Sequence, residues 1–219
     1  MYPGLAILKH SADNSLNMPD ALPDCSAGTR GYIADYLRSL SALLEQIDPD
    51  AVAKVADVLY GCWERGARLV LCGNGGSAST ASHLVCDLSK NIYLEGGRPF
   101  EVVALTDSAA VLLAWGNDTD FSNVFAGQAR TWLRAGDVLL AISGSGNSPN
   151  VLAAVKVGCE VGATTIGLCG YSGGRLAEMA DLALVARRDN MQQVEDVHMV
   201  LGHVLFSALR DRINGRLAA

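Results

Sequence analysis

Residues 69–87 read Leu69-Val-Leu-Cys-Gly-Asn-Gly-Gly-Ser-Ala-Ser-Thr-Ala-Ser-His-Leu-Val-Cys-Asp87, and this segment sets the architecture of the chain. Its apolar start, residues 69–72, is typical of a buried strand. The glycines that follow allow a tight turn that another molecule can approach closely. Ser77, Ser79 or Thr80 is then expected to cap a helix. Because the first N–H groups of a helix lack partners within it, this strand, turn and helix predict an anion site.

A histidine and a carboxylate follow on the predicted helix. His83 and Asp87 are four residues apart, so they share one helix face. In a predicted last helix, about 100° of rotation per residue places Glu195 and His203 on one side, whereas His198 points away from His203. If the two helices meet, the four side chains form a two-histidine, two-carboxylate metal site, or act as general acid and base. For any single histidine on such a helix, a buried structural role is the more common alternative.

Composition limits the class of protein. The 219 residues are enough for one α/β domain with additional helices. A net charge of −6 argues against nucleic acid or an anionic membrane as the main partner, and no apolar run approaches the ~18 residues that a membrane span needs. The six cysteines are scattered without a CxxC pair, and the N-terminus does not resemble a signal peptide. We therefore expect a reduced, cytoplasmic protein.

Strand and helix patterns alternate along the chain. Strands are predicted at residues 69–72, 102–105, 137–142, 164–169 and 182–185, and the main helices at 29–47, 51–66, 109–115, 121–133, 151–160 and 191–213. Continuous apolar strands separated by helices predict the α/β class, with a parallel five-stranded sheet covered by helices on both faces. The proline-containing residues 1–27 predict a flexible N-terminal arm, and residues 28–219 a single domain.

Polar loops follow two more of the predicted strands. The first contains Asp107, and the second is Ser143-Gly-Ser-Gly-Asn-Ser148, which offers three hydroxyl groups and a serine followed by proline at the start of the next helix. Because the carboxyl ends of parallel strands share one edge, we expect these loops and the 73–77 turn to form one phosphate site. For residues 143–148 alone, a serine-rich turn without a ligand is the alternative. Without the lysine of a P-loop, the loop does not predict a nucleoside triphosphate site.

With these motifs the chain resembles the phosphoheptose isomerases of the sugar isomerase (SIS) superfamily over residues 30–215. The motifs are Cys72-Gly-Asn-Gly-Gly-Ser with His83 and Asp87, Gly116-Asn-Asp, Gly136-Asp-Val-Leu-Leu-Ala-Ile-Ser-Gly-Ser-Gly-Asn-Ser, and the helix from Glu195 to His203. The resemblance implies an SIS-type fold, a Zn²⁺ ion, and a homotetramer whose sites lie between subunits.

The resemblance also implies a reaction and roles for single residues. Asp87 and His203 would move a proton between C1 and C2 of sedoheptulose 7-phosphate, through an enediol, to give D-glycero-D-manno-heptose 7-phosphate. Zinc would be held by His83, Asp87, Glu195 and His203. The residues implied in substrate binding are Asn74, Gly75, Ser77, Asp107, Asn117, Asp118, Ser143, Gly144, Ser145, Ser148 and Glu195. Asp87 and Glu195 depart from the family pattern, which has glutamate and glutamine at these positions.

Two other functions fit parts of the pattern. A non-catalytic SIS protein, acting as a sugar-phosphate sensor or a protein-binding adaptor, could keep the phosphate loops. It would have no need of His83, Asp87 and His203 together, so their joint presence favours an enzyme. An isomerase acting on a different ketose phosphate would carry the same motifs. For Asn117 and Asp118, the structural alternative is an ordinary helix end.

Overall fold

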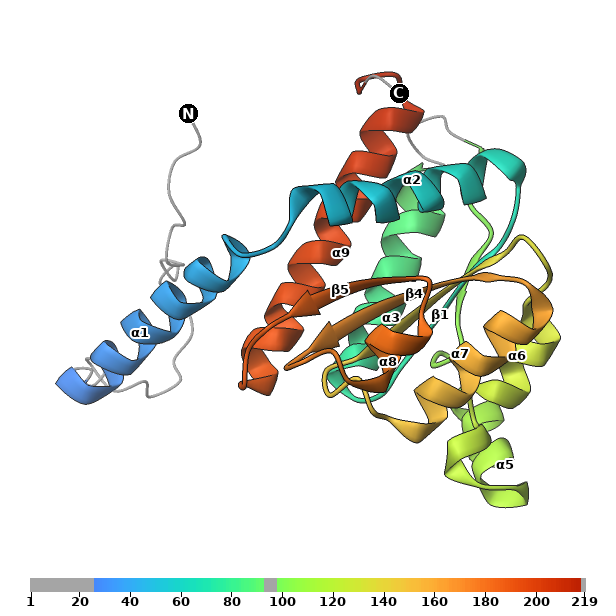
Figure 1. Ribbon diagram of the computed structural model, residues 1–219, viewed down its shortest axis with the longest axis horizontal. Coiled ribbons are helices and arrows are strands. Elements are labelled where there is room, and N and C mark those ends of the chain that lie inside the picture. The colour runs from blue at the N-terminus through green and yellow to red at the C-terminus, as the bar shows by residue number, and fades with distance from the viewer. Residues whose placement is uncertain (1–25, 93–97, 218–219) are drawn as a thin grey trace, which may run out of the picture. The chain divides into compact units, whose positions relative to one another are not determined.

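The computed structural model describes residues 26–92 and 98–217 (Figure 1). The chain divides into two compact units, Met1–Tyr36 and Leu37–Ala219. The described part of the first unit is the beginning of helix α1 (Ala27–Leu44), in which the rings of Tyr32 and Tyr36 lie 6.5 Å apart. The rest of α1 belongs to the second unit. Most of the predicted arm, residues 1–25, lies outside the described residues.

The second unit contains the parallel sheet that the sequence predicts. Its five strands are β1 (Leu69–Gly73), β2 (Val102–Ala104), β3 (Val138–Ser143), β4 (Thr164–Gly170) and β5 (Leu182–Ala186). Their order is β2-β1-β3-β4-β5, and every pairing is parallel. The chain therefore leaves β1 towards one edge of the sheet and returns on its other side at β3. This reversal opens a crevice at the carboxyl ends of β1 and β3, where ligands bind in such folds.

Helices cover both faces of the sheet, as predicted (Figure 1). Besides α1, the helices are α2 (Pro49–Arg65), α3 (Gly76–Cys86), the π-helical turn η1 (Asp87–Asn91), α5 (Ala109–Asp118), the 3₁₀ turn η2 (Phe121–Asn123), α6 (Ala126–Trp132), α7 (Pro149–Val161), α8 (Gly174–Met179) and α9 (Met191–Ile213). Successive strand residues point to opposite faces: Leu69 and Leu71 pack in one core with α2, α3 and α9, whereas Val70 and Cys72 pack in the other with α6 and α7.

Three differences from the predicted helices concern residues near the candidate site. Helix α3 starts at Gly76, with Gly75 at its N-cap (φ 54°) and no side-chain cap, because this glycine lets the chain turn directly into the helix. Ser77, Ser79 and Thr80 consequently lie inside the first turns rather than at the cap. Helix α5 continues through Asn117 and Asp118 to a C-cap at Thr119. The helix predicted at 121–133 is broken between η2 and α6, where Val124 and Phe125 are buried in the core.

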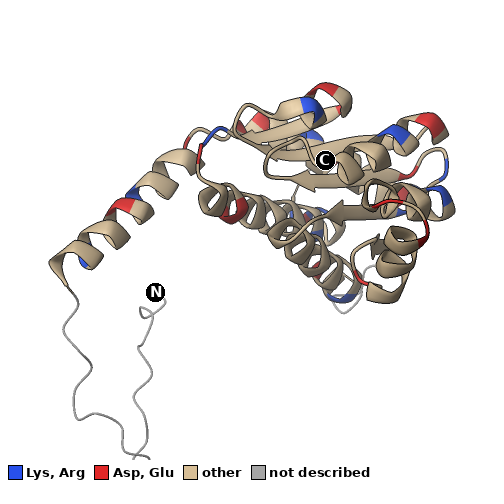
Figure 2. Cartoon of the chain, turned by 90° about the horizontal axis from the view of Figure 1, so that it is seen from below, with Lys and Arg blue, Asp and Glu red and all other residues tan. Residues whose placement is uncertain are grey.

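The described surface carries charges of both signs. Figure 2 shows acidic and basic residues interspersed among the helices, in keeping with a net charge of only −6 over 219 residues. Within the described ranges, no helix has both the length and the apolar character that crossing a membrane requires.

Candidate active site

The three polar loops lie at the same edge of the sheet, as the sequence predicts. They follow β1, β2 and β3, which are adjacent parallel strands. The hydroxyl of Ser82 in α3 donates to Asp107 Oδ1 at 2.5 Å and so joins this helix to the loop after β2. In the loop after β3, the Ser143 hydroxyl donates to Ser148 Oγ at 3.1 Å. Ser148 is the N-cap of α7 and makes no side-chain capping bond. Pro149 has no N–H and the Val151 N–H donates to Asn150 Oδ1, which leaves the Asn150 N–H, beside the Ser148 hydroxyl, for an anion.

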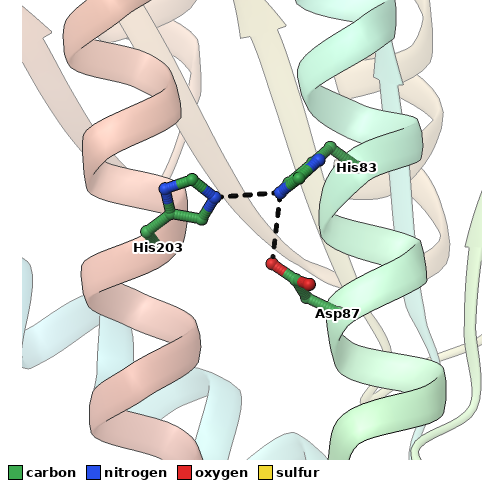
Figure 3. Close-up of side chains that lie close together, drawn as sticks. All are labelled: His83, Asp87 and His203. Carbon is green, nitrogen blue, oxygen red and sulfur yellow. Dashed lines mark hydrogen bonds and ion pairs between the residues drawn. The ribbon is translucent and has the colours of Figure 1, made fainter. Parts of the chain in front are cut away.

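Two histidines and a carboxylate meet between α3 and α9 (Figure 3). The Nε2 atoms of His83 and His203 are 2.9 Å apart, and His83 Nε2 lies 3.3 Å from Asp87 Oδ2. One possible ligand atom from each of the three residues lies within 4.8 Å of the other two. Two imidazoles and a carboxylate are the donor set of many catalytic zinc sites, in which the fourth position stays open. The arrangement therefore fits a divalent ion, and the same groups can carry protons.

A glycine lets the two helices approach closely enough for the histidines to meet. Gly202 precedes His203 in α9 and packs against Leu84, the residue after His83 in α3. A Cβ atom at position 202 would lie 3.0 Å from Leu84 Cδ2 and 3.3 Å from its Cγ. Gly202 was not predicted from the sequence, although a glycine inside a helix next to a candidate ligand is a recognisable signal of close packing.

Asp87 has a second partner that the sequence analysis missed. Residues 87–91 form a π-helical turn, a feature that often marks functional sites. From the end of this turn, the Asn91 amide donates to Asp87 Oδ1 at 3.3 Å, while Oδ2 faces His83. Asn91 thus orients the carboxylate so that its other oxygen faces His83. Residues that hydrogen-bond to metal ligands commonly orient them in this way.

Glu195 lies outside the cluster of His83, Asp87 and His203. Its carboxylate rests against Gly76 at the start of α3, where a Cβ atom would collide with it. The prediction considered only the angle around the helix axis, but eight residues also rise about 12 Å along it. Glu195 is therefore two turns away from His203. At this position the positive end of the α3 dipole favours its negative charge.

Asn74, expected to contact a sugar, is paired with another asparagine. Its Nδ2 donates to Asn150 Oδ1 at 2.8 Å, and Asn150 Nδ2 donates to Asn74 Oδ1 at 2.9 Å. Asn150 is only 2% exposed and was not singled out from the sequence. A hollow of about 320 Å³ borders this pair and Ser148, with the loop of residues 120–122 on its other side.

The remaining candidates are placed as follows. Asn117 and Asp118 are exposed on α5, and the Asn117 amide donates to Asp118 Oδ1 at 2.8 Å. His198 is fully buried and has the structural role considered for a single histidine: its Nε2 donates to the Cys169 carbonyl at 2.9 Å. Burial lowers the pKa of His198 below its ordinary value of 6.5, so the ring is neutral at pH 7. The ring lies away from the cluster, as predicted.

Comparison with known proteins gives a consistent result. The family model described as "SIS domain" matches residues 32–170. A phosphoheptose isomerase from Rhodospirillum rubrum is 39% identical over 163 residues, which cover 74% of this chain and 86% of that protein. One from Geotalea daltonii is 35% identical over 186 residues, which cover 85% of this chain and 96% of that protein.

Solved structures agree with the sequence relatives. A phosphoheptose isomerase from Francisella tularensis superposes with a TM-score of 0.79 at 31% identity, covering 84% of this chain and 98% of that one. One from Neisseria gonorrhoeae gives 0.77 at 31% identity, with 83% and 98% coverage. The Vibrio vulnificus NanR protein complexed with ManNAc-6P, at 17% identity and a TM-score of 0.65, shares the fold alone.

Proposed function

The chain belongs to the phosphoheptose isomerases of the SIS domain family, and on this premise we propose that it converts sedoheptulose 7-phosphate to D-glycero-D-manno-heptose 7-phosphate. The observation that carries this proposal is the cluster of His83, Asp87 and His203 between α3 and α9. A protein that only binds a sugar phosphate has no use for such a group. The identity and coverage of the relatives support an enzyme rather than a sensor or adaptor.

The proposed ion is Zn²⁺, held by His83, Asp87 and His203. At 2.9 Å one Nε2 carries a hydrogen and donates it to the other. In the tautomer with the hydrogen on Nδ1, each ring can instead turn its Nε2 lone pair to a cation. The donor set suits zinc. When bound there, the ion would polarise the substrate oxygens on C1 and C2. Glu195 is two turns away, and we assign it to the substrate rather than to the ion.

The chain's own groups then account for the proton transfers. In the direction from ketose to aldose, a proton leaves C1, an enediol forms, and a proton is added at C2 while a hydroxyl hydrogen moves from O1 to O2. We assign the two carbon proton transfers to Asp87 and His203. The phosphate would bind Ser143, Ser145 and Ser148 at the N-terminus of α7.

The other substrate contacts complete the proposed site. Gly144 lies in the same loop as the phosphate ligands, whereas Gly75 is the N-cap of α3 and Ser77 lies in its first turn. Asp107 would accept a hydrogen bond from a sugar hydroxyl. Asn117 and Asp118, exposed on α5, stay candidates for contact with the far end of the sugar or with a second subunit.

We further propose a cytoplasmic homotetramer. An apolar groove of about 440 Å³ lies between α2 and α9. Val200 and Val204 on its rim are 36% and 47% exposed. Apolar surface of this kind is typical of an interface between subunits. Free thiols at the described cysteines support a reducing compartment.

The decisive experiment follows sedoheptulose 7-phosphate by NMR after metal removal and after adding back Zn²⁺. We expect an aldoheptose 7-phosphate to appear only with the metal, and Asp87→Asn and His203→Gln each to lower kcat by at least about 100-fold. Ser89→Ala, an exposed change on the same turn as Asp87, serves as the control and should retain full activity.

Other outcomes would contradict the proposal. Tight binding of the sugar phosphate without turnover would indicate a sensor. Turnover of another ketose phosphate in preference would indicate a different substrate. Full activity in both the Asp87 and His203 variants would show that these residues do not transfer the protons.

A further inference from the structure

Asn74 and Asn150 form a reciprocal amide pair across the crevice. The two hydrogen bonds measure 2.8 and 2.9 Å, and both run between side chains 76 residues apart in sequence. Asn150 Oδ1 also accepts from the N–H of Val151 at 3.0 Å, which fixes the plane of its amide on the first turn of α7. Asn150 is thus held by the backbone of α7, and its amide reaches Asn74 in the turn after β1.

The pair connects two of the loops that form the candidate site. Asn74 directly follows β1, in the turn that leads to α3 and to His83. Asn150 is the second residue of α7, directly after the 143–148 loop and β3. Strands β1 and β3 are neighbours at the point where the strand order reverses. The pair therefore ties together the two loops that form the walls of the crevice.

Burial makes this tie difficult to break. Asn150 is 2% exposed, so water cannot readily replace Asn74 as its partner. Separating the loops would leave a buried amide with unmet donors and acceptors, which proteins strongly avoid. Beside the pair lies the hollow bordered by residues 120–122, so nothing else in the described structure occupies the space between Asn74 and that loop.

We propose that Asn150 is a positioning residue, which holds Asn74 and thereby fixes the spacing of the 73–77 and 143–148 loops around the bound sugar phosphate. The identity of that ligand rests on the proposed function. Asn150 does not need to touch the substrate: it acts through Asn74 and through the start of α7. Since the loops grip the substrate in both its ground state and its transition state, loss of the pair should raise KM more than it lowers kcat.

The test compares Asn150→Leu, which keeps a branched side chain of four heavy atoms and removes the amide, with Asn74→Ala and with the double variant. We expect each single change to raise KM for sedoheptulose 7-phosphate by about tenfold or more. Because the two residues act as one unit, the double variant should be no worse than the poorer single variant. Amide hydrogen exchange should accelerate at residues 73–77 in Asn150→Leu, far from position 150 in sequence.

Two controls separate positioning from general destabilisation. Val157→Ala removes buried volume two turns further along α7 and should lower the melting temperature without changing KM or exchange at residues 73–77. Lys156→Ala, on the exposed face of α7, should change neither. If Asn150→Leu does not fold, Asn150→Ala provides the same comparison with a smaller side chain.

Clear results would overturn the inference. Unchanged KM and unchanged exchange at residues 73–77 in Asn150→Leu would do so, as would single effects that multiply in the double variant. If the wild-type protein fails to turn over sedoheptulose 7-phosphate, the proposed function fails. The hydrogen exchange then decides by itself whether Asn150 fixes the loop.

Discussion

Replacing Gly202 by valine is expected to push α3 and α9 apart and to weaken metal binding. A Cβ atom at position 202 would lie 3.0 Å from Leu84 Cδ2, whereas carbon atoms in contact prefer about 3.5–4.0 Å. Relieving this one contact requires a shift of roughly 0.5 Å. Valine adds two Cγ atoms beyond the Cβ, so it demands a larger displacement. Leu84 is buried, so its side chain has little free space to move into.

The size of the shift determines the effect on the cluster. Nitrogens bound to tetrahedral zinc at about 2.0–2.1 Å lie roughly 3.4 Å apart, and the Nε2 atoms of His83 and His203 are now separated by 2.9 Å. A shift of half an ångström, as alanine would cause, therefore stays within what the ion tolerates. The larger shift for valine does not, and we expect Gly202→Val to lower metal affinity by about 10–100-fold.

Stability should separate the same two variants. Overpacking costs about 1–3 kcal/mol, whereas replacing an interior helix glycine by alanine gains about 1 kcal/mol. Gly202→Ala should consequently be close to neutral, and Gly202→Val clearly destabilised. Gly116→Ala is the matched control, because a Cβ atom there would meet Val124 Cγ1 at an ordinary 3.6 Å.

The assay is a Co²⁺ titration of metal-free protein followed by visible absorption, together with thermal unfolding. Co²⁺ adopts the tetrahedral geometry of zinc and reports its ligands through its absorption bands. Wild-type affinity and an unchanged spectrum in Gly202→Val would refute the argument that this contact sets the distance between the histidines.

Three further predictions concern other parts of the molecule. Burial lowers the pKa of His198 below 6.5. Below pH 6.5 the unfolded chain therefore binds a proton that the folded chain does not, and the free energy of unfolding should fall as the pH drops. Urea unfolding at pH 5.5 and 7.5 should show a smaller pH dependence in His198→Gln. Asn91→Leu should weaken Co²⁺ binding by about tenfold, because Asp87 loses its second partner; an unaltered titration would exclude this role. Val204→Glu should dissociate the proposed tetramer in sedimentation experiments, since a charge would be buried in the apolar groove; retention of the tetramer would place the interface elsewhere.

The sequence predicted the parts of the fold that depend on pattern alone. The apolar run at 69–72 gave a central strand, and the periodicity of residues 191–213 gave the last helix with both ends correct. Parallel strands oblige their following loops to share an edge. For this reason Asp107 and the serines of the 143–148 loop could be placed together before any coordinates were known.

The sequence pattern could not predict distances between side chains on different turns or elements. The helical angle put Glu195 beside His203, but the rise along the axis separates them. The partnership of Asn74 with Asn150 depends on two loops meeting across a crevice, and neither residue carries a local sign of it. The N-cap of α3 was also missed: Gly75 rather than a serine occupies it, because a backbone conformation open to glycine replaced the expected side-chain cap.

The burial of the cysteines offers a direct way to observe the site. Burial raises the pKa of Cys62, Cys72 and Cys169 to about 12, so these thiols stay protonated and unreactive at neutral pH. Cys86, by contrast, is exposed and immediately precedes Asp87. Once Cys25 and Cys159 are replaced by serine, a thiol-reactive fluorophore should attach at Cys86 alone. Quenching of that dye by a paramagnetic ion would then report occupancy of the cluster in real time, without substrate and without turnover.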